Sequence, residues 1–255
     1  MKMTPEVMTE ELAQTAGLPL CMVLLYGSAA SGEQTGTRPG ANLLIVLERL
    51  GRTELDALAG PVRRWIRAGH PSPQLFTKDR LTRSADVFPI EIQDLKETGR
   101  VLFGEDLLAR VRIQPEHLRI EVEHELKGKL AYLQSEYLRV GESDRALRGL
   151  LAGSLSTFLI LARALLRFFD PVVPPRKSDA LRALCGHIAL DAEALETVQA
   201  IKDGLIQPRG PELRDLWDRY LTTVEQLVIT ADTRLDPGGG VLWPDDKTTQ
   251  ERTSP

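Results

Sequence analysis

The sequence predicts an α+β fold: a small mixed sheet backed by helices, followed by an all-α helical bundle. Two observations predict it. Four short apolar runs typical of strands all lie before residue 94, whereas from Pro115 onward the apolar residues recur at helical spacing. A set of strands followed by a set of helices favours an α+β protein or two separate domains. We therefore expect a sheet domain at 1–110, a helical bundle domain at 115–235 and a disordered tail at 236–255.

The sheet domain is predicted from its apolar runs. Leu20–Tyr26 (LCMVLLY) and Asn42–Leu47 are continuously apolar, as strands buried on both faces are. The other expected elements are a short helix at 5–16, a helix at 53–68 with Thr53 as N-cap and Pro61 kinking or splitting it, and strands at Gln74–Thr77 and Val87–Gln93.

The helical domain is predicted from periodicity and capping residues. Leu118, Val122, Leu126, Leu130 and Leu133 form one stripe on the first long helix. The expected helices are 115–140, 144–169, 179–188 with Ser178 as N-cap, 192–204 with Asp191 as N-cap, and 211–234.

Composition excludes several classes of protein. The formal net charge is −4, so the chain lacks the basic surplus of a general nucleic-acid binder. Cys21 and Cys185 each lie in an apolar stretch, which favours buried thiols in a reducing compartment over zinc ligands. The N-terminus lacks the apolar core of a signal peptide, and the longest apolar run, 149–169, contains two arginines. We expect a cytoplasmic protein that does not bind membranes.

The segment that carries most information is VLLYGSAASGEQTGTRPGANLLIVL, residues 23–47. A strand ends at Gly27, where the absence of a side chain lets a ligand approach the backbone, and the Ser28 hydroxyl can donate to a phosphate oxygen. A P-loop is excluded because Glu33 stands where the lysine is required, and the spacing of a dinucleotide fingerprint is absent. A flexible connection without a ligand is the alternative.

A second feature is FPIEI, residues 88–92, which places one carboxylate between apolar residues. Burying Glu91 requires a partner, whereas a solvated face requires none. Strand alternation puts Glu91 opposite Ile90 and Ile92, which leaves both interpretations open.

Taken together, the Gly-Ser turn between two buried strands and the later segment with a central acid resemble the polymerase-β-like nucleotidyltransferase superfamily. The chain looks most like its small bacterial members that carry a helical C-terminal domain. The run DVFPIEIQDLKETGRVLFGED, residues 86–106, is similar to the closing segment of those domains, and the resemblance covers about 18–108. It implies a nucleotidyltransferase-like mixed sheet. In such enzymes an Asp-x-Asp pair and a third acid hold two Mg²⁺ ions that align a nucleoside triphosphate.

Carried onto this chain, the resemblance assigns nucleotide binding to Gly27, Ser28 and Asn42, and a vestigial catalytic role to Glu91 as the third acid. The Asp-x-Asp pair falls on Gly40-Ala41-Asn42, so two of three acids are missing. This implies a nucleotide-binding protein with impaired or absent transfer, weak Mg²⁺ binding and no intact metal site. Two alternatives stay open: an active nucleotidyltransferase with a reduced metal site, and a non-catalytic module that binds a protein partner.

The helical domain carries two weaker signals. Arg119 with His124, and Arg182 with His187, fit the Arg-x4-His spacing of some helical-bundle ribonucleases. Because arginine and histidine are common on helix surfaces, chance is the simpler explanation.

The other signal is the group Lys127, Lys129 and Tyr132 on the first long helix. In two-domain members of the superfamily a helical domain faces the nucleotide, which would bring these side chains to a triphosphate. A solvated helix face is the alternative.

Overall fold

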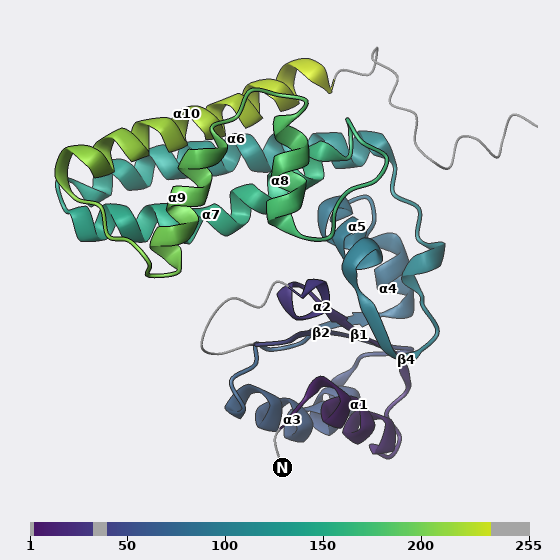
Figure 1. Ribbon diagram of the computed structural model, residues 1–255. Helices are drawn as coiled ribbons and strands as arrows, with labels where there is room; N and C mark the ends of the chain where they lie inside the picture. The colour runs from purple at the N-terminus through teal and green to yellow at the C-terminus, as the bar shows by residue number, and fades with distance from the viewer. Residues whose placement is uncertain (1–2, 33–39, 236–255) are drawn as a thin grey trace, which may run out of the picture. The chain divides into compact units, whose positions relative to one another are not determined.

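The computed structural model describes residues 3–32 and 40–235, and the chain divides into two compact units, Met1–Leu118 and Arg119–Pro255. The N-terminal unit contains a four-stranded mixed sheet with helices, and the helical unit contains long helices (Figure 1). The predicted fold class, an α+β protein with a mixed sheet followed by a helical bundle, is therefore confirmed. The predicted disordered tail lies outside the described residues.

The sheet has the strand order β3-β2-β1-β4. Strand β1 (Leu20–Tyr26) pairs antiparallel with β2 (Asn42–Leu47) and with β4 (Arg100–Gly104), and β2 pairs parallel with β3 (Gln74–Thr77). The two continuously apolar runs are thus the two central strands, as their burial on both faces requires. The register joins Tyr26 to Asn42, so the end of β1 lies beside the start of β2.

Helices cover both faces of the sheet (Figure 1). On one face, α1 (Pro5–Gln14) and α3 (Arg52–Arg67) bury Met8, Leu12, Leu58 and Trp65 against the odd-numbered residues of β1 and β2. On the other, α4 (Lys78–Arg83) and α5 (Pro89–Thr98) bury Leu81, Ile92 and Leu95 against the even-numbered ones. A four-residue helix, α2 (Ser28–Ser31), follows β1, and a 3₁₀ turn, η1 (Leu108–Arg110), precedes the helical unit.

The predicted strand at Val87–Gln93 is wrong, because Pro89–Thr98 is the helix α5. Proline at the first helical position fits a helix start, since its missing N–H would have no partner there. Ile92 and Leu95 then lie on one helical face, and both are buried. Strand β4, which the sequence did not reveal, supplies the fourth strand instead.

Two details of α3 also differ from prediction. Gly51, not Thr53, is the N-cap, and its N–H donates to a Glu54 carboxylate oxygen at 2.9 Å. The helix continues from Arg52 to Arg67 through the buried Pro61, so the predicted split does not occur.

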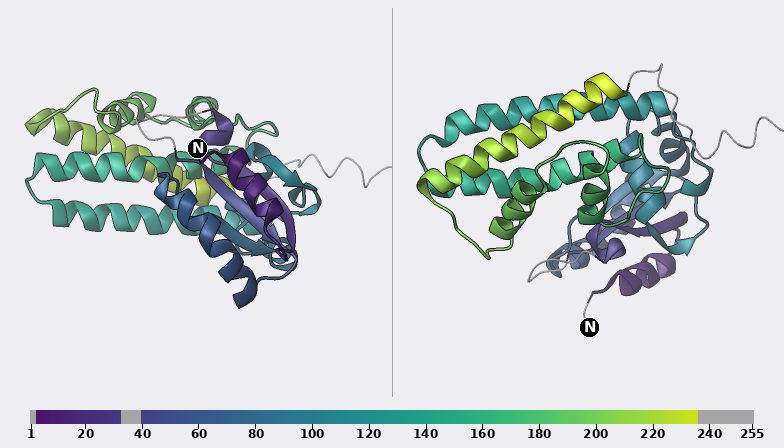
Figure 2. Two further views of the ribbon diagram at one scale, coloured as in Figure 1. Left: turned by 90° about the horizontal axis from the view of Figure 1, so that it is seen from below. Right: turned by 45° about the horizontal axis from the view of Figure 1, so that its top comes forward.

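The helical unit consists of five helices among the described residues, all close to their predicted bounds. They are α6 (Pro115–Val140, which begins at the end of the N-terminal unit), α7 (Asp144–Leu166), α8 (Lys177–Cys185), α9 (Ala192–Lys202) and α10 (Gly210–Arg234). Helices α6, α7 and α10 run side by side in the different views (Figures 1 and 2). Asp191 caps α9 as predicted, whereas α8 begins one residue before Ser178, with Arg176 at its N-cap.

Helix α7 is the centre of the helical unit and packs against α8, α9 and α10. By length and composition it is the one described helix that could cross a membrane, and half of its most apolar window is buried inside the protein. Arg163 and Arg167 are buried with it, and Arg163 donates to the carbonyl of Pro174 at 3.0 Å. A core helix that packs on several neighbours accounts for this composition.

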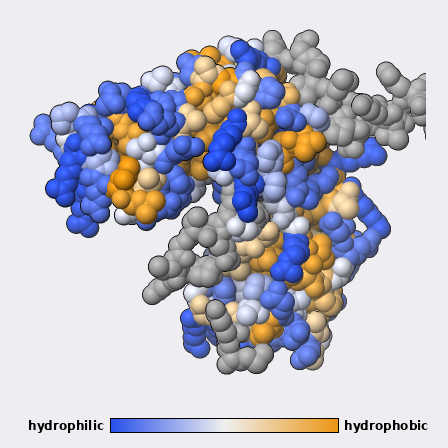
Figure 3. All heavy atoms as spheres, viewed as in Figure 1, coloured by the Kyte–Doolittle hydropathy of each residue, from blue (hydrophilic) through white to orange (hydrophobic). Residues whose placement is uncertain are grey.

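Aromatic contacts join α6 and α7 to α10. Tyr137 stacks on Trp217 with ring centroids 4.3 Å apart, and the Tyr220 hydroxyl lies 2.9 Å from Ser154 Oγ. At the surface, hydrophobic and hydrophilic side chains are interspersed over the face in Figure 3. The most exposed apolar side chains are Leu138, Val172 and Leu205, which belong to different segments, and isolated apolar residues of this kind are ordinary.

Candidate functional site

The turn between β1 and α2 brings two of the predicted site residues together. Gly27 has a φ of +73°, and a β-carbon placed on it would lie 2.8 Å from the side-chain nitrogen of Asn42. Two observations therefore favour glycine here: the positive φ of its backbone, and the Asn42 amide that occupies the space a side chain would need. The same turn places Ser28 as the first residue of α2.

Asn42 lies on the face of the sheet that α5 covers. It alternates with Leu44 and Val46, which pack with Ile92 and Leu95 of α5 in one buried cluster. Tyr26, the cross-strand partner of Asn42, packs partly buried on the same cluster, and this burial raises the pKa of the Tyr26 phenol.

Glu91 is placed differently from the prediction. It belongs to the first turn of α5 and is exposed, whereas its neighbours Ile90 and Ile92 are buried. Its carboxylate therefore projects from a helix and not from a strand of the sheet. Its assignment as a third acid stays a prediction from the resemblance.

The donor set at the start of β2 does not fit Mg²⁺, which prefers several charged oxygen ligands in octahedral geometry. Gly40 has no side chain, and Asn42 offers a neutral amide oxygen. Within residues 3–32 and 40–235, no three His, Cys, Asp or Glu side chains gather closely enough to hold a metal ion.

A residue that sequence reasoning missed fixes the start of β2. His70 accepts a hydrogen bond from the Ala41 N–H through Nδ1 at 3.1 Å, and its Nε2 lies 2.9 Å from the Met3 carbonyl. Acceptance at Nδ1 requires the hydrogen on Nε2, which then donates to Met3. The ring stacks on Trp65 with centroids 3.7 Å apart. Nothing in the spacing of the sequence marks a contact between residues 41 and 70.

Comparison with known proteins gives a similarity in structure but none in sequence. No family model matches the chain, and no curated protein matches it by sequence. Among solved structures, it is similar to spectinomycin adenyltransferase AAD(9) from Enterococcus faecialis, determined with ATP and spectinomycin. The TM-score is 0.47 at 10% identity, over 89% of this chain and 98% of that chain.

The candidate residues of the helical unit are largely engaged in ion pairs. Lys127 donates to Glu123 at 2.7 Å and to Asp232 at 2.6 Å; Asp232 first and Glu123 second raise the pKa of this ammonium group. Lys129 pairs with Glu125 at 3.4 Å. Tyr132, in contrast, is 62% exposed. These contacts favour the interpretation of a solvated helix face for Lys127.

The two Arg-x4-His pairs also have local partners. Arg119 pairs with Glu123 and Arg182 with Asp179, while His187 stacks against Phe169 with centroids 5.4 Å apart. These contacts give the arginines and His187 structural roles, and the ribonuclease interpretation gains no support from them.

Proposed function

We propose that the N-terminal unit is a nucleotidyltransferase-type domain that binds a nucleotide but does not transfer it. The observation that carries the proposal is the contact between Gly27 and Asn42. It puts a neutral amide beside the Gly-Ser turn, at the position where the resemblance calls for a metal-binding aspartate.

Electrostatics supports the absence of transfer. Two-metal transfer needs carboxylates that offset the charge of both ions and hold them in place. A unit-charge pair at 4 Å and intermediate dielectric is worth roughly 4 kcal/mol, so each missing carboxylate forfeits a large share of the metal affinity. Both positions of the Asp-x-Asp pair lack a charge, and the remaining acid, Glu91, is exposed on a helix.

The remaining groups suit a phosphate without a metal. The Ser28 hydroxyl and the Asn42 amide nitrogen can both donate to phosphate oxygens, and the glycine leaves the backbone accessible. Replacement of an acid by asparagine also removes repulsion between the protein and an anionic ligand. Binding that does not need a cation is the expected consequence.

Nucleotide binding measured with and without Mg²⁺ tests the proposal. We expect ATP to bind in EDTA with a Kd within about twofold of that in Mg²⁺, and Asn42→Ala to weaken it by about tenfold through the loss of one charge-assisted hydrogen bond. Gln93→Ala, at a half-buried amide elsewhere in the same unit, is the matched control. Binding only in Mg²⁺ supports an enzyme with a reduced metal site. Absence of binding supports an interaction module.

A further inference from the structure

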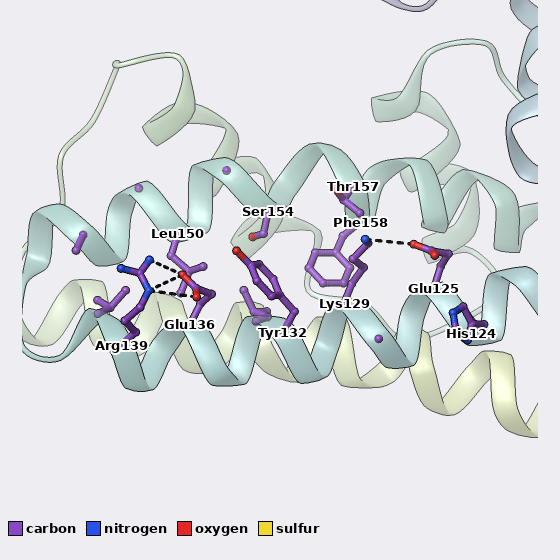
Figure 4. A pocket seen from close by; sticks show the side chains of 16 residues that line it. His124, Glu125, Lys129, Tyr132, Glu136, Arg139, Leu150, Ser154, Thr157 and Phe158 are labelled. Atoms are coloured by element: carbon purple, nitrogen blue, oxygen red, sulfur yellow. Dashed lines mark hydrogen bonds and ion pairs between the residues drawn. The ribbon is translucent and has the colours of Figure 1, made fainter. Parts of the chain in front are cut away.

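The helical unit has a groove between α6 and α7 that the proposed nucleotide site does not include. Its volume is about 850 Å³. One wall carries long polar side chains of α6, and the other carries small residues of α7 (Figure 4). Its apolar lining includes Leu133, Leu150 and Phe158.

Three glycines in helix interiors keep this groove open. They are Gly128 on α6, and Gly149 and Gly153 on α7, and a β-carbon added to any of them would meet no atom within 4 Å. Glycine inside a helix costs about 1 kcal/mol relative to alanine. Because packing within this chain does not require them, their absent side chains leave room for something outside the chain.

The α6 wall is a row of five residues with alternating charge around an exposed aromatic ring. In order these are Glu125, Lys129, Tyr132, Glu136 and Arg139 (Figure 4). Their spacing of three and four residues puts them on one face of the helix. Glu125 and Arg139 each lie seven residues from Tyr132, while Lys129 lies three before it and Glu136 four after it.

The charges of this row are complementary to those of a second copy of the row that runs in the opposite direction. If two copies of α6 pair antiparallel about a two-fold axis at Tyr132, Glu125 faces the partner's Arg139 and Lys129 faces the partner's Glu136. Parallel pairing would instead set like charges against each other. We propose that the groove between α6 and α7 is a homodimer interface, in which α6 pairs antiparallel with α6 of a second copy.

The glycines fit the same arrangement. The helices α6 and α7 form a hairpin that turns after Val140 and resumes at Asp144, so Tyr132 and the stretch between Gly149 and Gly153 are about equally far from the turn. A two-fold axis at Tyr132 therefore brings the partner's Tyr132 to the level of the two glycines. An exposed tyrosine entering a depression at the centre of an interface is a typical binding hot spot.

The ion pairs within α6 do not prevent these residues from forming ion pairs with the second copy. Lys129 pairs with Glu125, and Arg139 with Glu136, within the same helix. Pairs within one helix contribute little where the cation is exposed, as the Arg139 side chain is at 74%, and a carboxylate accepts from two donors at once. A two-fold arrangement of two helical hairpins is also a common way to complete a four-helix bundle.

Sedimentation velocity of the full chain, from about 1 to 100 μM, tests the interface. We expect a mass twice the 28.3 kDa of one chain. Glu125→Arg alone and Arg139→Glu alone should each weaken dimerisation by about tenfold or more, since each creates two like-charge contacts per dimer. An equimolar mixture of the two variants should form heterodimers, in which every contact is again between opposite charges. Recovery on mixing also shows that both variants fold.

Glu196→Arg, the same charge change at an exposed position of α9, should leave the dimer intact. Gly153→Arg places a long charged side chain in the groove from a position where a β-carbon would meet no atom within 4 Å, and it should give a monomer of unchanged helical content. A wild-type protein that stays monomeric at 100 μM overturns the proposal. That result is the one expected if the groove binds some other ligand. A dimer that tolerates both charge reversals, or a mixture that stays monomeric, overturns it too.

Discussion

The side-chain nitrogen of Asn42 lies 2.8 Å from the point that a β-carbon on Gly27 would occupy. The end of β1 and the start of β2 therefore depend on each other. The backbone of Gly27 has a conformation that other residues adopt only at a cost, and the amide of Asn42 fills the space that its missing side chain leaves.

Gly27→Ala should destabilise the N-terminal unit by about 1–3 kcal/mol, because a residue with a β-carbon rarely adopts its φ of 73° and ψ of −154°. The contact with Asn42 adds to this, because the amide must move. The free energy of unfolding in urea, followed by circular dichroism, measures the change. Asn42→Ala removes the contact, so the difference in stability between the double variant and Asn42→Ala alone reports the backbone cost. If Gly27→Ala alone is as stable as the wild type, the turn is not strained in this way.

His70→Phe should separate the two roles of this ring. Phenylalanine keeps the stacking on Trp65 but loses the hydrogen bonds to Ala41 and Met3. We expect a loss of about 1–3 kcal/mol, since a partly buried N–H and a carbonyl lose their partners. Hydrogen exchange at the Ala41 amide should become faster, which is a local measurement. The same change at His117 serves as the control, and equal exchange rates in wild type and His70→Phe would refute the role.

Asp191 should make the free energy of unfolding of the helical unit fall at low pH. Its carboxylate accepts from Arg219 at 2.7 and 3.0 Å and from the Ala194 N–H at 2.9 Å. The Arg219 guanidinium first, and then this N-cap hydrogen bond, hold the pKa of Asp191 below its usual range. A lowered pKa stabilises the fold above the unfolded pKa, about 3.9, and this contribution is lost as pH falls below it.

Asp191→Asn keeps a cap but removes the charge. After allowance for solvent screening, it should cost about 0.5–1 kcal/mol at pH 7. Urea unfolding at a series of pH values should show the gap between wild type and variant closing below about pH 4. Asp179→Asn, at an exposed ion pair with Arg182, should show a smaller gap throughout. A gap that stays constant down to pH 3 would contradict the assignment.

Glu91→Gln should have little effect on the fold. The side chain is exposed on the first turn of α5, so the change should alter the free energy of unfolding by less than about 0.5 kcal/mol. It should also leave nucleotide transfer at the wild-type level, which we expect to equal background. A fall in Mg²⁺-dependent transfer on this substitution would instead assign Glu91 to a working reduced metal site.

The parts of the fold that the sequence predicted are those in which hydrophobic pattern decides the structure. The runs Leu20–Tyr26 and Asn42–Leu47 are strands with the predicted bounds, because a continuous apolar run between glycines has few other solutions. The failure at Val87–Gln93 has a physical cause too. The residues PIEI fit the alternation of a strand and the start of a helix at a proline equally well. Only the packing around them decides between strand and helix. Strand β4 is short and mostly not buried, so its pattern is weak.

The contact between Gly27 and Asn42 was predictable because it depends on local chain geometry. Tyr26, the residue before Gly27, pairs with Asn42 across adjacent strands. Glu91 could not be positioned, because its location depends on whether its segment is strand or helix. His70 is distant in sequence from Ala41, and contacts of this kind between loops leave no periodic signal.

Calorimetric titration of Mg²⁺ in the presence of ATP tests the central claim most directly, with the wild type compared with the double variant Gly40→Asp, Asn42→Asp. The wild type should show no Mg²⁺ binding beyond that of ATP itself, since its neutral positions offer no carboxylate pair. The double variant should gain a measurable Mg²⁺ site and lose some stability, because a β-carbon on Gly40 would lie 3.2 Å from Pro71 Cδ. Tight binding of two Mg²⁺ ions by the wild type would contradict the account.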